Sequence, residues 1–261
     1  MKNYMLTISY DGSRYNGWQR QKSSDNTIQG KIENVLSLMS SHSVEVNGSG
    51  RTDADVHALG QTANFKLDIE MDKSEILDYL NKYLPDDVAV LRIDEVPERF
   101  HSRLCAKSKT YMYRIQNSLI SNVFERKYMY KYPDKIDIDK MRLAADAMLG
   151  KHDFLGFSSL KKPKKSTVRT VFGIDVERLG DEIRICYRAD GFLYNMVRIM
   201  TGTLIEAGIG IKSREDIDRV FETGNREYAG FTAPARGLTL VGVEYSGEYE
   251  KYGSLADAEG R

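Results

Sequence analysis

The residues best suited to chemistry lie in one glycine-rich stretch, Asn47–Ala58, which reads NGSGRTDADVHA. Its two glycines permit backbone angles that other residues resist, so a loop here can present side chains into a cleft. Arg51 precedes Asp53 by two residues, and a guanidinium at that spacing can hold a carboxylate ionised and oriented. A catalytic carboxylate is one interpretation, and a hairpin turn in which Asp53 caps the following backbone is another.

A metal site is a third interpretation of the same stretch. On a strand, the alternate spacing of Asp53, Asp55 and His57 would point all three side chains to one side. A metal ion would need further ligands, and no other segment supplies a second group of them.

Two residues outside this stretch also have types suited to a site. Tyr111 lies on an alternating segment, Lys109–Ile115, where by itself it indicates a core tyrosine on a strand. Arg198 lies on an apolar helical segment from Tyr194 to about Ala207. An arginine on so apolar a helix needs a buried anionic partner, and an internal salt bridge would also satisfy it.

The segments that must position these residues begin with a strand, helix, strand, strand, helix, strand pattern. The sequence predicts strand Tyr4–Tyr10, a helix capped by Thr27, strands around Val44–Val46 and Gln61–Leu67, a helix opened by an Asp72–Glu75 capping box and stopping before Pro85, and a strand over Val88–Val96. This order is that of a split βαβ unit.

A similar pattern follows in the second half. The predicted elements are strand Lys109–Ile115, helix Asp139–Leu149 ended by Gly150, strands Val168–Glu177 and Ile183–Ala189, the Tyr194–Ala207 helix, a short helix capped by Ser213, and strand Leu240–Tyr245. Because strands come in adjacent pairs, an α+β fold is favoured over one doubly wound sheet. We expect two related halves, residues 1–104 and 105–261, with antiparallel sheets and helices as split βαβ (ferredoxin/RRM-like) units around a central cleft.

Composition limits the classes of protein to consider. Hydrophobic residues make up 41% and charged residues 29% of the 261 residues, a balance typical of soluble proteins. The N-terminal segment alternates like a strand and lacks a secretory signal, and no apolar run approaches a membrane span. Two cysteines, Cys105 and Cys186, do not indicate a disulfide framework. We expect a cytoplasmic protein.

The distribution of charge is more informative than its sum, which is zero. Acidic residues outnumber basic ones between Asp68 and Arg99, whereas His101–Arg114 contains bases and no acid. A second acid-free cluster joins the lysines of Lys161–Lys165 to Arg169. These clusters could form a basic face that attracts phosphates, or they could be ordinary solvated loops.

Five segments carry a resemblance to a known family. GRTDADVHA resembles the signature GRTDAGVHA of the bacterial tRNA pseudouridine synthase A family. The other matching segments, in chain order, are YDGSRYNGWQRQ with TIQGKIENVL, FHSRLCAKSKTYMYRI, GFLYNMVRIMTGTLIEAG and TAPARGLTLVGVEY. Several spaced motifs in the expected order are far more specific than one short pattern.

The resemblance implies an isomerase that converts uridine to pseudouridine in the anticodon arm of tRNA, working as a homodimer. The reaction breaks the N-glycosidic bond, turns the uracil and rejoins it to ribose through carbon, so no cofactor or metal is expected. The resemblance makes Asp53 the catalytic carboxylate or nucleophile. Such a role suits glycosyl chemistry, which passes through electron-poor carbon that a carboxylate can trap or stabilise.

The resemblance also assigns roles to further residues. Arg51 is expected to pair with Asp53, Tyr111 to stack on the flipped uracil, and Arg198 to pair with the catalytic carboxylate. The expected substrate-binding residues, besides Tyr111, are His101, Lys107, Lys109 and Asn195.

Two positions have alternative interpretations. Asp55 stands where the family usually has glycine, which removes backbone freedom, and its carboxylate could raise the pKa of Asp53, repel phosphate or point away from the site. Trp18, the only tryptophan, could stack on RNA or serve as a packing anchor.

Two other functions compete with an isomerase. A non-catalytic RNA-binding module would keep the basic clusters but would not need Arg51, Asp53, Tyr111 and Arg198 together. A hydrolytic glycosidase could use Asp53 and Asp55 as its carboxylate pair, but it would have to admit water and would leave an abasic product.

Overall fold

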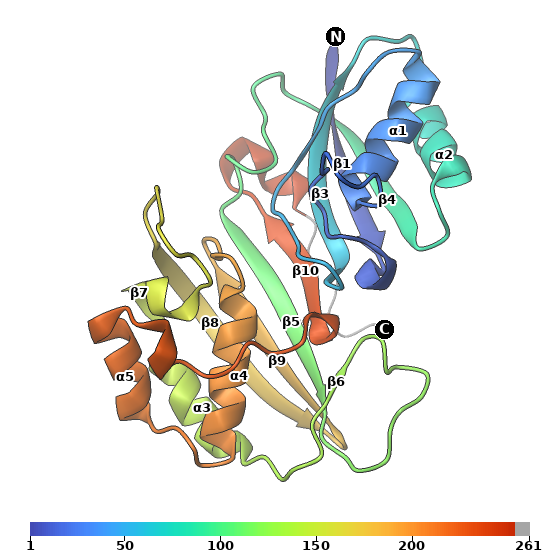
Figure 1. Cartoon of the computed structure of the whole chain (residues 1–261). Coiled ribbons are helices and arrows are strands. Elements are labelled where there is room, and N and C mark those ends of the chain that lie inside the picture. Colours follow the sequence, from blue (N-terminus) through green and yellow to red (C-terminus); the bar gives the residue numbers. More distant parts are fainter. Residues whose placement is uncertain (254–261) are drawn as a thin grey trace. The chain divides into compact units, whose positions relative to one another are not determined.

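The computed structural model describes residues 1–253, which divide into two compact units (Figure 1). The first unit contains Met1–Lys109 and the segment that begins at Thr239, and the second contains Thr110–Leu238. The chain leaves the first unit after Lys109 and returns to it at Thr239 for the closing strand. The division into halves 1–104 and 105–261 stays a prediction.

The sheet of the first unit is built around its N-terminal strand. The strands are β1 (Lys2–Tyr10), β2 (Val46–Gly48), β3 (His57–Leu67), β4 (Val88–Val96) and β10 (Leu238–Glu244), in the order β4-β1-β3-β10, with β2 paired to β3. β1 is antiparallel to both β3 and β4, whereas β10 is parallel to β3. β1 is buried on both faces, and on one of them Met5 packs in a core cluster with Val96, Phe100, Val243, Tyr245 and Tyr252.

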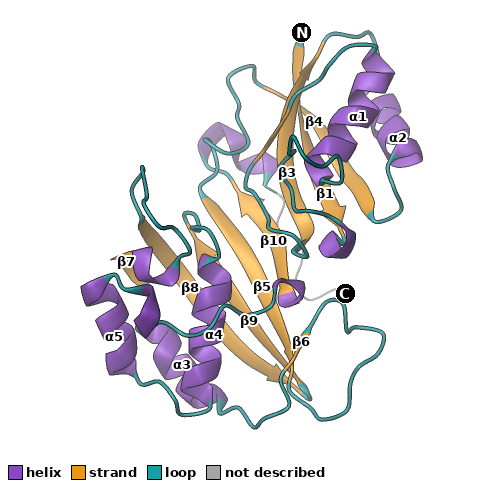
Figure 2. Cartoon of the chain, in the orientation of Figure 1, coloured by secondary structure: helices purple, strands orange, loops and turns teal. Residues whose placement is uncertain are grey.

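Two helices pack on this sheet, and their predicted caps are confirmed. Thr27 caps α1 (Ile28–Ser40) by accepting a hydrogen bond from the Gly30 amide at 3.2 Å. Asp72 opens α2 (Lys73–Tyr83) in a capping box with Glu75. Figure 2 shows α1 and α2 next to each other beside the sheet.

The second unit is also built from a sheet with helices packed beside it. Its strands are β5 (Ser108–Gln116), β6 (Tyr130–Lys131), β7 (Gly150–Asp153), β8 (Val168–Leu179) and β9 (Glu182–Ala189), in the order β5-β9-β8-β7, with β6 paired to β5. Its helices are α3 (Ile138–Asp146), α4 (Met196–Gly208) and α5 (Arg214–Thr223), which Figure 2 shows on one side of the sheet. Ser213 caps α5 as predicted. The α+β prediction is confirmed, with a mostly antiparallel sheet.

The structure corrects two details of the prediction. α3 ends at Asp146, three residues before the predicted end, because the chain tightens into a turn in which Met148 donates to the Ala145 carbonyl. Gly150 has the left-handed φ expected of a helix end (+92°), but it opens β7. Sequence patterns also did not predict β6, β7 or the short 3-10 helices, which are Gly12–Arg14, Leu155–Phe157, Arg226–Tyr228, Ala235–Gly237 and Gly247–Tyr252.

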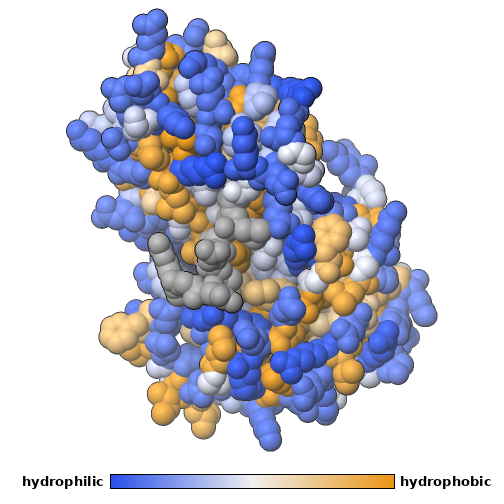
Figure 3. All heavy atoms as spheres, turned by 180° about the vertical axis from the view of Figure 1, so that it is seen from behind, coloured by the Kyte–Doolittle hydropathy of each residue, from blue (hydrophilic) through white to orange (hydrophobic). Residues whose placement is uncertain are grey.

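The surface is mostly hydrophilic on the face drawn in Figure 3, with apolar side chains scattered over it. Within residues 1–253, no helix is both long and apolar enough to cross a membrane. Exposed apolar side chains concentrate in the loop between β5 and β6, which projects from its unit in Figure 1. They are Leu119, Ile120, Val123 and Phe124, with 81%, 82%, 54% and 88% of their surface exposed.

Candidate active site

The loop Ser49–Val56, hereafter the Asp53 loop, connects β2 to β3 in the first unit. Its first residues are fixed to β3. The Ser49 amide donates to the Thr62 carbonyl at 2.7 Å, and the Ser49 hydroxyl donates to the Gln61 side chain at 2.7 Å. Gln61 in turn donates its amide to the Gly50 carbonyl at 3.2 Å. The start of the loop therefore has a fixed backbone path.

The middle of the loop is held at Thr52, the residue before the candidate carboxylate. Its carbonyl accepts a hydrogen bond from the Trp18 amide at 3.0 Å, and its hydroxyl bonds the Tyr10 hydroxyl at 2.8 Å. Burial raises the pKa of Tyr10 to about 12, so this phenol stays protonated at neutral pH. Asp53 itself is half-buried.

Trp18 is a packing anchor for this loop. Only 1% of its surface is exposed, and its indole lies so close to Gly48 that a Cβ there would come within 2.5 Å of the ring. A Cβ at Gly17 would come within 2.7 Å of the Thr52 carbonyl oxygen, and Gly17 has a left-handed φ of +86°. The alternative that Trp18 stacks on RNA is wrong, because the ring is covered by the protein.

Asp55 adopts a backbone conformation that favours glycine. Its φ is +64° and its side chain is exposed, at a turn closed by the Val56 amide donating to the Asp53 carbonyl at 3.2 Å. The position where the resembling sequences usually carry glycine is thus one where the chain turns through the left-handed region. Aspartate tolerates this region better than most residues do, so the loop keeps its turn.

The structure does not support a metal site in the loop. β3 begins only at His57, so Asp53, Asp55 and His57 do not alternate along one strand. His57 is buried and accepts a hydrogen bond from the Gly12 amide at 3.1 Å, while Asp55 is exposed. Among residues 1–253, no group of three histidine, cysteine, aspartate or glutamate side chains is placed to hold a metal ion.

The two basic residues nearest the start of the loop differ in their surroundings. Arg51 is exposed on the loop itself, and its expected pairing with Asp53 stays a prediction. The Lys109 ammonium donates to the Ser49 carbonyl at 2.5 Å, which puts a positive charge against the loop. Lys109 therefore supports the loop backbone in addition to any contact with substrate.

The other two residues expected to bind substrate in the first unit lie after Phe100. His101 is half-buried, and its Nδ1 accepts a hydrogen bond from the Arg103 amide at 3.1 Å. Lys107 has an exposed side chain, and its backbone amide donates to the Glu244 carbonyl of β10 at 2.8 Å. Their role in binding substrate stays a prediction.

Two candidate residues lie in the second unit. Tyr111 on β5 is buried and meets Phe192 edge to face, with ring centroids 5.2 Å apart. Arg198 on α4 is half-buried. Its guanidinium donates to the Ala233 carbonyl at 2.7 Å and to the Asn195 side chain at 2.9 Å. The neighbours of both side chains restrict their orientation.

Asn195 has a structural role beside the predicted one. It caps α4 with a left-handed φ of +59°, and its amide also donates to Ser159 at 2.9 Å. The oxygen of its side-chain amide, Oδ1, is the acceptor that orients Arg198. The anionic partner expected for Arg198 stays a prediction.

Sequence reasoning missed the uncharged residues that fix the Asp53 loop. Tyr10, Thr52, Gln61 and Ser49 belong to three separate segments, and hydrogen bonds between distant segments do not produce a periodic pattern. Trp18 stands out in the sequence only as the single tryptophan.

Comparison with known proteins decides the family. The family model described as tRNA pseudouridine synthase matches residues 6–103 and 144–246, a range that includes the Asp53 loop and α4. This chain belongs to the tRNA pseudouridine synthase family. It is an isomerase, so the non-catalytic RNA-binding module and the hydrolytic glycosidase are excluded.

Several relatives match along their whole length. A tRNA pseudouridine synthase A of Bacillus sp. (strain KSM-64) is 49% identical over 247 residues, which are 94% of this chain and 100% of that protein. A tRNA pseudouridine synthase A 2 of Clostridium tetani is 42% identical over 246 residues, 94% of this chain and 99% of the relative. Among solved structures, a Cbf5-Nop10-Gar1 complex matches 91% of this chain and 48% of its own chain at 11% identity and a TM-score of 0.39, too distant to bear on function.

The left-handed turn at Asp55 makes a prediction about stability. Asp55→Gly should be more stable than Asp55→Ala by about 1 kcal/mol, because alanine is strained at this φ and glycine is not. The measurement is urea unfolding of both variants beside the parent protein. Equal midpoints and slopes for the two variants would show that the turn is not strained.

Proposed function

We propose that this synthase isomerises uridine in the anticodon arm of tRNA in the cytoplasm, with Asp53 as the catalytic carboxylate. The observation that carries the proposal is the Asp53 loop itself, in which a half-buried carboxylate follows directly on a residue, Thr52, fixed through both its backbone and its side chain. Catalysis depends on holding a reacting group in one geometry, and the hydrogen bonds of the neighbouring Thr52 and Ser49 support such a role for the loop.

The isomerisation rearranges bonds within one nucleotide. The bond from ribose C1′ to uracil N1 breaks, the base turns, and a bond from C1′ to C5 forms while C5 loses its proton and N1 gains one. Electrons and atoms balance without an oxidant or a donated group. A carboxylate can trap or stabilise the electron-poor centre formed when the glycosidic bond breaks.

We propose that Tyr111, Arg198 and Arg51 act on the same uridine as Asp53. Tyr111 would stack on the flipped uracil, a contact worth about 1–3 kcal/mol per base. Arg198 would pair with the carboxylate, and its fixed guanidinium supports that role. Arg51 would pair with Asp53 as well, and its exposed side chain could also enter the space that the flipped nucleotide leaves in the stack.

The exposed basic residues would bind the tRNA backbone. Lys161, Lys162, Lys164 and Lys165 lie in an exposed loop before β8, and Lys107 is exposed before β5. His101, Lys109 and Asn195 complete the proposed contacts to substrate. Lysines in such a role position the RNA without reading its sequence.

Substitution of Asp53 tests the role of the carboxylate. Asp53→Asn keeps the shape of the side chain and removes its charge, so the protein should fold while pseudouridine formation falls by at least roughly a thousandfold. Pseudouridine is measured in unmodified tRNA by carbodiimide treatment and primer extension, and folding by thermal unfolding. Activity within tenfold of the parent enzyme would move the catalytic role to another residue.

Another prediction tests the exposed loop before β8, which carries Lys161, Lys162, Lys164 and Lys165. Replacing Lys161, Lys162, Lys164 and Lys165 with serine should weaken tRNA binding and reduce the log–log salt slope of affinity by roughly 0.7–0.9 for each phosphate that these lysines neutralise. The control replaces Lys73 and Lys82, which are exposed on α2 in the acidic segment. A slope unchanged in the first variant would assign the loop to solubility alone.

We also propose that the chain forms a homodimer. The exposed apolar loop between β5 and β6 supports this, because a soluble protein rarely leaves four large apolar side chains uncovered within six residues. Leu119→Ser with Phe124→Ser should shift sedimentation toward the monomer at micromolar concentration. Ile211→Ser, which changes an isolated exposed side chain, is the control and should not. Equal sedimentation of all three proteins would remove the loop from any dimer interface.

A further inference from the structure

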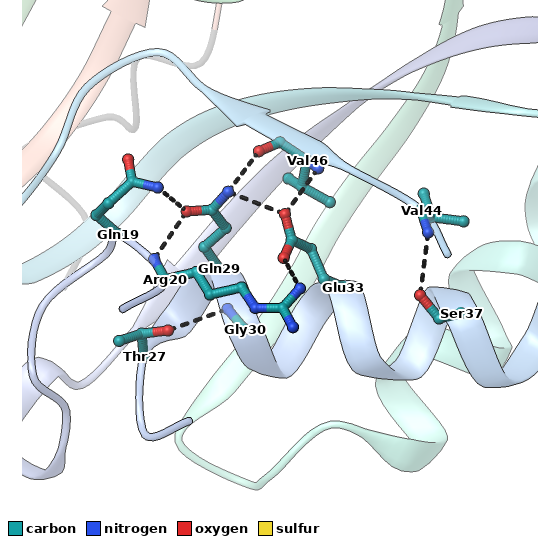
Figure 4. Close-up of polar contacts among 9 residues, drawn as sticks. All are labelled: Gln19, Arg20, Thr27, Gln29, Gly30, Glu33, Ser37, Val44 and Val46. Atoms are coloured by element: carbon teal, nitrogen blue, oxygen red, sulfur yellow. Dashed lines mark hydrogen bonds and ion pairs between the residues drawn. The ribbon is translucent and has the colours of Figure 1, made fainter. Parts of the chain in front are cut away.

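Two buried polar side chains on α1 lie outside the residues considered so far. Gln29 and Glu33 are one turn apart, with only 7% and 5% of their surface exposed. Figure 4 shows them between the segment that carries Gln19 and Arg20 and the strand residue Val46. Burying a carboxylate is costly unless its oxygens accept hydrogen bonds. The donors to Glu33 therefore identify the segments that this side chain connects.

Gln29 uses every bonding position of its side-chain amide. Its oxygen accepts hydrogen bonds from the Gln19 side chain at 2.6 Å and from the Arg20 backbone amide at 2.9 Å. Its nitrogen donates to the Val46 carbonyl at 3.0 Å and to Glu33 at 2.9 Å. One amide thus joins two segments that are far apart in sequence.

Glu33 completes the same connection. One carboxylate oxygen accepts from Gln29 and from the Val46 amide at 3.0 Å, and the other accepts from the Arg20 guanidinium at 3.2 Å. A carboxylate only accepts, so its charge requires the nitrogen of Gln29 to face it. The oxygen of Gln29 is then left to face Arg20. The Arg20 backbone amide can only donate and the Val46 carbonyl can only accept, so they require the same orientation of Gln29 as Glu33 does.

The two segments joined by this group are those that flank the Asp53 loop. Val46 opens β2, which leads directly into Ser49. On the other side, the Gly17 and Trp18 carbonyls accept hydrogen bonds from the first two amides of α1, and Trp18 donates to Thr52 in the loop. The link from Glu33 to the residue before Asp53 is continuous.

We infer that Glu33 and Gln29 are positioning residues for the isomerisation, which act through Trp18 and β2 to fix the Asp53 loop. This inference rests on the proposed role of Asp53. Neither side chain is expected to touch the tRNA, because both are buried beneath the segment that carries Arg20. Their replacement should therefore affect the catalytic step and leave binding intact.

The test is Glu33→Gln, which keeps the size of the side chain, removes its charge and places an NH2 group against a donor, either the Arg20 guanidinium or the amides of Gln29 and Val46. Displacement of a catalytic group by about 1 Å can cost a hundredfold in rate, so we expect kcat to fall about 10- to 100-fold. KM for tRNA should stay within about twofold, because the residues that bind the tRNA are unchanged.

A second measurement reports on the loop independently of activity. Trp18 is the only tryptophan in the chain and packs against Gly48, so its fluorescence follows the contact between its segment and the Asp53 loop. In Glu33→Gln the emission should move to longer wavelength as water reaches the indole.

Ser37→Ala is the matched control. Ser37 lies one turn further along α1, and its hydroxyl accepts a hydrogen bond from the Val44 amide at 3.1 Å (Figure 4). The control removes a hydrogen bond from the same helix to a residue two before Val46, and it leaves every bond of Gln29 and Glu33 in place. It should leave kcat, KM and the Trp18 emission as in the parent protein.

The outcomes separate this inference from the proposed function. If Asp53→Asn is inactive and Glu33→Gln matches Ser37→Ala in kcat and emission, Glu33 has no positioning role. If Asp53→Asn stays active, the catalytic assignment fails, and the Trp18 emission still decides whether Glu33 fixes the loop.

A milder variant covers the case in which Glu33→Gln does not fold. Arg20→Met removes one donor to Glu33 from an exposed side chain, so the fold should survive. We expect a fall in kcat of about fivefold with unchanged KM and a smaller shift of the Trp18 emission. An unchanged kcat and emission in this variant would overturn the inference.

Discussion

The hydrogen bond from the Trp18 amide to the Thr52 carbonyl is the interaction on which the candidate site depends most. The Asp53 loop belongs to neither a helix nor a strand, so its shape must be imposed by its neighbours. A single hydrogen bond contributes only about 1 kcal/mol, and the loop therefore needs several at once. Thr62, Gln61, Tyr10 and Lys109 supply the others, and the buried indole of Trp18 packs against Gly48 just before the loop.

The same principle holds for the candidate residues of the second unit. Arg198 is fixed by a carbonyl and an amide oxygen, and Tyr111 by the edge of Phe192, before any substrate is present. Side chains that are already oriented lose little freedom when tRNA binds. In the proposed mechanism, the binding energy would then be available to flip the uridine, which costs a few kcal/mol for a stacked base.

Charged residues are distributed unevenly along the chain. The chain has no net charge, yet its partner is a polyanion. The exposed lysines of the loop before β8 and the acid-free segment after Phe100 concentrate positive charge, while acidic residues gather around α2. Exposed charges more than about 10 Å apart are largely screened at 0.1 M salt, so local clusters matter more for tRNA than the total.

The sequence by itself determined the regular elements, their caps and the residue types of the site. Periodicity, Thr27, Asp72 and Ser213 are local signals, and the GRTDA motif places its residues within one short loop. Only the tertiary structure decided what fixes that loop, that Asp55 turns through the left-handed region, that Lys109 contacts Ser49 and that Trp18 is buried against Gly48. It also supplied β6 and β7, which are too short to show a period. The reason is that these features depend on contacts between segments distant in sequence, and a pattern along one segment carries no information about its partner.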